Sequence, residues 1–120
     1  MGEVLNDTTK MGNISIADDV VASIVGIAAI EVKGVSRLTG NITKELVSKL
    51  GKKNLANGVK IQIEGNNVIA DISLELEYGN NIKKVTEEVQ LKVKQAVENM
   101  TGLHVSMVNV VVSGIRLDKE

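Results

Sequence analysis

The side chains that could perform chemistry in this chain are few and lie far apart in the sequence. His104 is the single histidine, and there is no cysteine. Asp71, Glu75 and Glu77 fall at alternate positions of a predicted strand, so their carboxylates would share one face, as in an acid–base pair or a metal site. No histidine accompanies them nearby in the sequence, and a row of carboxylates is the usual solvated face of a sheet. We therefore interpret His104 and these acids as surface residues and predict no metal site.

Sites for nucleotides, nucleic acids and covalent catalysis also lack their motifs. The glycines form neither GxGxxG nor GxxxxGK[ST], which cradle phosphates. Tyr78 is the only aromatic residue, which excludes a stacking platform for single-stranded nucleic acid. No two glycines stand three apart, as the GxxG loop of KH-like RNA-binding domains requires. Without a nucleophile–base pair, we predict a protein that has no cofactor and is not an enzyme.

The basic residues are concentrated in one part of the chain. Residues 33–60 contain seven basic residues and a single acid, Glu45, for a net charge of +6, while the remaining residues carry −7. A surface polarised in this way attracts an acidic protein segment or an anionic membrane, and salt weakens the contact. A solvated loop is the alternative interpretation. The candidate partner-binding basic patch comprises Arg37, Lys44, Lys49, Lys52, Lys53 and Lys60.

The first half of the chain is predicted to supply a strand and two helices. The Ile14/Ile16 alternation predicts a short strand over residues 13–17. Asp18 and Asp19 are placed to cap the start of a largely buried helix, which ends near Lys33-Gly34. Residues 35–40 are ambiguous, with a brief extended piece as one interpretation, and residues 41–51 resemble a short amphipathic helix. The apolar side of the first helix consists of Val20, Val21, Ile24, Val25, Ile27, Ala28 and Ile30.

The second half shows clearer periodicity. Residues 59–64 and 68–78 alternate around the turn Gly65–Asn67, which predicts a β-hairpin with one wet face. A long helix then runs from a cap at Asn80 or Asn81 to about Thr101, followed by a left-handed Gly102. The final strand, from His104, changes phase, so we expect a bulge near Met107 or burial on both sides. The predicted inner stripe of the long helix is Ile82, Val85, Val89, Val93, Ala96, Val97 and Met100.

This order of elements predicts a two-layer α+β domain. We expect a mostly antiparallel sheet of about four strands, with two main helices on one face, in the order β-α-(short α)-β-β-α-β. Residues 13–116 would form this single domain, between a disordered tail at 1–12 and a short tail at 117–120. The most apolar window, Val20–Ile30, is far shorter than the roughly 20 residues that cross a bilayer, so no transmembrane segment is predicted.

Four stretches of the sequence carry a resemblance: "GIAAIEVKGVSRLTG" (Gly26–Gly40), "LGKKNLANGVKIQI" (Leu50–Ile63), "LELEYGNNI" (Leu74–Ile82) and "VKQAVENMTGLHVSMVNVVV" (Val93–Val112). Together they resemble the alkaline-shock protein family, whose members are also called envelope-stress response proteins and are typical of Gram-positive bacteria. The resemblance extends in order over residues 12–115. It implies a small cytoplasmic protein without known catalysis, and the family defines no catalytic residues.

The resemblance also implies kinds of partner. Some members gather at the membrane through a separate membrane-anchored protein, and others are linked to cell-envelope or fatty-acid metabolism. We therefore expect a stress-response protein that acts by binding other proteins. Copies of itself are included, because the apolar run "VNVVV" in the final strand has no charged residues between Val105 and Ile115 to guard its edge. The alternative is a KH-like nucleic-acid-binding regulator that uses the basic segment.

Overall fold

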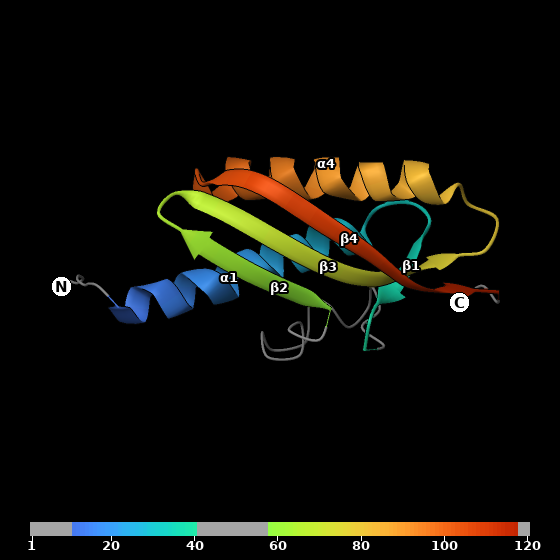
Figure 1. Cartoon of the computed structure of the whole chain (residues 1–120), viewed down its shortest axis with the longest axis horizontal. Helices are drawn as coiled ribbons and strands as arrows, with labels where there is room; N and C mark the ends of the chain where they lie inside the picture. Colours follow the sequence, from blue (N-terminus) through green and yellow to red (C-terminus); the bar gives the residue numbers. More distant parts are fainter. Residues whose placement is uncertain (1–10, 41–57, 118–120) are drawn as a thin grey trace.

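A computed structural model describes residues 11–40 and 58–117, with side chains in the first helix described from residue 18 onward. Figure 1 shows a twisted sheet with two helices behind it. The elements are α1 (Met11–Ile30), β1 (Val35–Leu38), β2 (Val59–Glu64), β3 (Asn67–Glu77), α4 (Ile82–Thr101) and β4 (His104–Arg116).

Strand β3 is the centre of the sheet. On one edge it pairs antiparallel first with β2, up to Ile72, and then with β1, from Leu74 to Leu76. On the other edge β4 runs parallel to it from Asn67 to Glu77. Two of the three pairings are antiparallel, so the predicted mostly antiparallel, four-stranded α+β sheet is confirmed.

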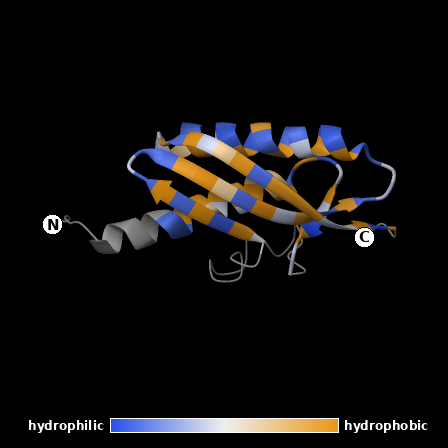
Figure 2. Ribbon diagram, viewed as in Figure 1, coloured by the Kyte–Doolittle hydropathy of each residue, from blue (hydrophilic) through white to orange (hydrophobic). Residues whose placement is uncertain are grey.

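Both helices pack on the same face of this sheet and against each other. Because β3 alternates, every second residue from Val68 to Leu76 faces the helices and is buried, whereas Asp71 and Glu77 face outward and are exposed. On α4 the residues buried beneath the helix recur every four positions, as an amphipathic helix requires. They are Val85, Val89, Val93 and Val97. Figure 2 shows the hydrophilic outer side of α4.

The predicted hairpin and bulge are confirmed. The β2–β3 register runs from Val59 opposite Ile72 to Glu64 opposite Asn67, which leaves a two-residue turn. In β4, Val105 lies opposite Val68 and Met107 lies opposite Ile69, so Ser106 is the extra residue of a bulge. The bulge places both Val105 and Val108 on the helix side, which explains the change of phase in the sequence.

The ends of α4 are built as predicted. The side chain of Asn81 accepts a hydrogen bond from the backbone N–H of Lys84 over 3.1 Å, which satisfies one of the unpaired donors of the first turn. At the other end Gly102 has φ +77° and its N–H donates to the carbonyl of Glu98. This left-handed residue turns the chain directly into β4.

The strand predicted at residues 13–17 is wrong. Residues 13–17 belong to α1, which begins at Met11, and not to a strand. The alternation of Ile14 and Ile16 covers only two residues, and it is overridden by helix formation through the apolar run that follows. Asp18 consequently lies inside α1 rather than at its N-terminus, and the first strand of the sheet is the extended segment β1.

Several predicted core residues lie on the surface. Val20 and Ile27 of α1 are 41 % and 37 % exposed, because α4 and the sheet cover only one side of that helix. Ile82 and Met100, at the two ends of the α4 stripe, are also exposed, as is Tyr78, which follows the end of β3. The predicted short helix at 41–51 lies outside the described residues.

Candidate interaction surface

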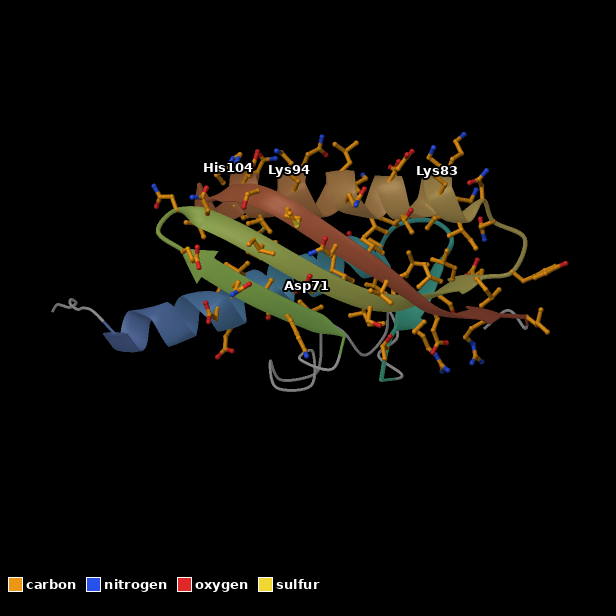
Figure 3. The ribbon with its side chains drawn as sticks, in the orientation of Figure 1. Asp71, Lys83, Lys94 and His104 are labelled. Carbon is orange, nitrogen blue, oxygen red and sulfur yellow. The ribbon has the colours of Figure 1, made fainter. Side chains whose placement is uncertain are left out.

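The carboxylates on the open face of the sheet are engaged by neighbouring strands. Asp71, labelled in Figure 3, accepts a hydrogen bond from the Asn109 side chain of β4 over 2.7 Å. Glu75 forms an ion pair with Nε of Arg37 over 2.9 Å. Within the described residues no group of three or more histidines or acids could hold a metal ion. These acids therefore tie strands together.

The basic patch predicted from the sequence is only partly described. Arg37 is half-buried on β1, and its charge is balanced by Glu75. Lys60 is exposed on β2, directly opposite Asp71 in the register. Arg37 is therefore not available as an unpaired positive charge of the patch. The other four residues, Lys44, Lys49, Lys52 and Lys53, lie outside the described residues.

His104 lies at the junction of α4 and β4. Its Nδ1 is 3.3 Å from a carboxylate oxygen of Glu98, and Nζ of Lys94 is 3.8 Å from the same oxygen. That oxygen also accepts a hydrogen bond from the backbone N–H of Val105 over 2.9 Å. The hydrogen bond from Val105, with smaller help from Lys94 and His104, lowers the pKa of Glu98 below its ordinary value. The predicted surface position of His104 is confirmed.

An open groove runs between α4 and β4. Its volume is about 330 Å³, and it is bordered by two exposed apolar side chains, Leu91 at 51 % and Met107 at 52 % exposure. Glu87 and Lys94 lie in the same groove, one on either side of Leu91 along the helix. The complete lining is Glu87, Gln90, Leu91, Lys94, Val105, Ser106, Met107 and Val108. We call this the α4–β4 groove.

At this groove, side chains of α4 form hydrogen bonds with the backbone of β4. The Gln90 side chain donates to the carbonyl of Val108 over 3.0 Å, and Glu98 accepts from the N–H of Val105. An incoming strand that paired with this part of β4 would have to displace both contacts. This part of the β4 backbone is therefore already engaged in intramolecular hydrogen bonds.

The groove was not found by sequence reasoning, because Leu91 lies on the side of α4 opposite the valine stripe. The available signal was a single leucine within an otherwise polar helix face, which surface helices often carry. Only the position of Met107 after the bulge, at the border of the same groove, makes that leucine part of a larger apolar surface.

The fold is a small two-layer α+β domain with an open, partly apolar groove between α4 and β4. The chain belongs to the alkaline-shock protein 23 family, described as having a cell envelope-related function, whose family model matches residues 6–117. The resemblance recognised in the sequence is thereby confirmed. No helix among the described residues is long and apolar enough to cross a membrane.

Similar proteins occur in Gram-positive bacteria. YqhY of Bacillus subtilis is 34 % identical over 113 residues, which cover 94 % of this chain and 84 % of that protein. YloU of the same organism is 35 % identical over 111 residues, covering 91 % and 92 %. A stress response regulator gls24 homologue of Streptococcus pyogenes is 27 % identical over 110 residues, and the match spans 62 % of its length.

Among solved structures, the fold is similar to that of the MamM CTD. One variant of that domain superposes with a TM-score of 0.51 over 87 % of this chain and 98 % of that chain, at 14 % sequence identity. At this identity the likeness concerns the fold alone.

Proposed function

We propose that this protein is a non-enzymatic member of the cell-envelope stress response that acts by binding other proteins through the α4–β4 groove. The observation that carries the proposal is the pairing of Leu91 and Met107, two large apolar side chains that are each about half exposed on one groove. Exposed apolar side chains rimmed by charges are typical of protein-binding surfaces. The family's envelope-related description and the stress-response name of a relative support a role in the cell-envelope stress response.

The place of action in this proposal is the cytoplasmic side of the membrane, reached through a partner that is itself anchored there. The test is fractionation of cells before and after envelope stress, with wild type compared with Leu91→Asp. The wild type should enter the envelope fraction and the variant should remain in the cytosol. Gln95→Asp serves as the control, because it adds a charge at an exposed position of α4 that lies outside the groove, and it should enter the envelope fraction as the wild type does.

Two results would overturn this function. One is a wild type that stays out of the envelope fraction under stress, and the other is a folded Leu91→Asp variant that enters it as the wild type does. Circular dichroism and urea unfolding establish that the variants are folded. Since Leu91 is exposed, its replacement should change the free energy of unfolding by less than about 1 kcal/mol.

The basic patch is a second proposed contact with an envelope partner. Its test is the simultaneous reversal of Lys49, Lys52 and Lys53 to Glu, which should leave folding intact and disperse the protein from the envelope fraction. Unchanged localisation would identify the basic run as a solvated segment. The absorbance ratio at 260 and 280 nm of the purified protein tests the nucleic-acid alternative, because a chain with one Tyr and no Trp absorbs weakly at 280 nm.

A further inference from the structure

The outer side of α4 carries charges in a pattern that is self-complementary on reversal. Four charged residues alternate in sign along the helix, on either side of Gln90 and Leu91. In chain order they are Lys83 (positive), Glu87 (negative), Lys94 (positive) and Glu98 (negative). The pattern is centred between residues 90 and 91, since 83 and 98 are equally distant from that point, as are 87 and 94. Two such helices laid antiparallel would therefore place Lys83 opposite Glu98 and Glu87 opposite Lys94.

We infer that the α4–β4 groove binds a second copy of this chain, through an antiparallel, two-fold symmetric contact between the two α4 helices. The inference rests on the proposed protein-binding function and deepens it: the second copy occupies the groove, and the membrane-anchored partner binds the resulting dimer. At the centre, Leu91 of each copy lies across from Gln90 of the other copy. Its side chain inserts toward Met107 of that other copy. On either side, Glu87 of one copy meets Lys94 of the other, and Lys83 meets Glu98 further out.

The spacing of Glu87, Leu91 and Lys94 allows all three side chains to contact the second copy at once. Glu87, Leu91 and Lys94 are separated by four and three positions, so they lie on one face of the helix and span about 10 Å. All three are exposed and all three line the groove. Figure 3 shows Lys83 and Lys94 pointing away from the sheet along the outer side of α4. The apolar centre supplies contact, and the flanking charges select the antiparallel register.

The contacts of β4 argue for helices rather than strands at this interface. Gln90 and Glu98 already bond the backbone of Val108 and Val105 at the groove. Glu87 and Leu91 take no part in those bonds, and Lys94 reaches only the Glu98 carboxylate, over 3.8 Å. A helix can therefore dock against α4 while the edge of β4 keeps its intramolecular partners.

The test uses single charge reversals and their mixture in sedimentation velocity at micromolar concentrations. Glu87→Lys alone, or Lys94→Glu alone, places like charges across both symmetric contacts and should raise the dissociation constant by about tenfold or more. A 1:1 mixture of the two variants restores opposite charges at both contacts, so a heterodimer should form at the wild-type affinity. The double variant carrying both reversals should also dimerise as the wild type does.

Lys92→Glu is the matched control, because Lys92 is an exposed residue of α4 on the side that faces α1 and lies outside the groove. It should leave the dissociation constant unchanged. A monomeric wild type, unaltered association of both single variants, or a mixture that fails to recover would each overturn the inference. Association through β4 edges would leave the association of both single variants unaltered.

Failure of this inference is distinguishable from failure of the proposed function. A wild type that enters the envelope fraction but does not dimerise overturns the dimer and leaves the function standing. A wild type that dimerises with the predicted charge dependence but never reaches the envelope fraction supports the dimer and overturns the function.

Discussion

The two sides of α4 differ in what they contribute to the molecule. The inner side carries valines at every fourth position, of which Val89, Val93 and Val97 are fully buried. The outer side carries alternating charges around one half-exposed leucine. Burial of the inner side holds the domain together, whereas nothing in the fold requires a leucine at position 91. Substitutions on the two sides of α4 should therefore have separable effects, the inner ones on stability and the outer ones on the proposed binding.

The largest expected effect is the introduction of a charge on the inner side. Val89→Asp should lower the free energy of unfolding by about 4 kcal/mol, because a carboxylate would be buried without a partner between α4 and the sheet. Lys92→Asp, on an exposed position of the same helix, should cost less than about 1 kcal/mol. Urea unfolding measures both, and similar losses for the two variants would contradict the division of the helix into two sides.

A smaller effect is expected where the inner side meets the turn after α1. Gly34 has φ +100°, and a Cβ there would lie 2.9 Å from Cγ2 of Val85. Gly34→Ala should therefore cost about 2 kcal/mol, from backbone strain and the displaced valine. The matched variant is Gly65→Ala, with φ +61° and open space around it, which should cost only about 1 kcal/mol. Equal melting temperatures for the two variants would rule out a destabilising contact between the added Cβ at position 34 and Val85.

The open face of the sheet should respond weakly, as the outer side of α4 does. Arg37 and Glu75 form an ion pair across β1 and β3, with side chains 22 % and 20 % exposed. A double-mutant cycle with Arg37→Ala and Glu75→Ala should give a coupling energy of about 1 kcal/mol. A value near zero would mean that Arg116, whose Nη1 is 4.0 Å from the same Glu75 oxygen, takes over the role of Arg37.

The smallest effect is a pH dependence at the junction of α4 and β4. The pKa of Glu98 is lowered in the folded protein from its ordinary value of 4.5, so its stabilising contribution is complete above that pH. The contribution is lost as the pH falls through the lower, folded-state pKa. Between pH 7 and about 3, the wild type should lose more stability than Glu98→Gln, which keeps an acceptor for Val105 but does not titrate. Parallel pH profiles of the two proteins would contradict this assignment.

Sequence periodicity predicted the second half of the domain well, because its signals agree with one another. Alternation in 59–77, the Asn81 cap, the valine stripe and Gly102 all point to the elements that the structure contains. The first half failed at residues 13–17, where two isoleucines alternate for too short a distance to outweigh the helix that follows. Exposure of Val20 and Ile27 depends on where α4 lies, which local sequence does not encode.

The candidate site was less predictable than the fold. Of the basic patch, Arg37 is neutralised by Glu75, a residue 38 positions away that no local pattern relates to it. The α4–β4 groove depends on a parallel pairing of β3 and β4 and on a bulge at Ser106, which together set Met107 beside α4. Such a surface is a product of tertiary structure, so the sequence shows its residues without showing that they meet.

The most direct measurement of the central claim is photo-crosslinking from α4 in living cells. A photoreactive amino acid is placed at position 91, in the groove, or at position 95, which is exposed but lies outside the groove. If the groove binds a second copy, illumination should produce a covalent adduct of twice the chain mass from position 91 and little from position 95. No such adduct from position 91, or equal yields from both positions, would contradict the account.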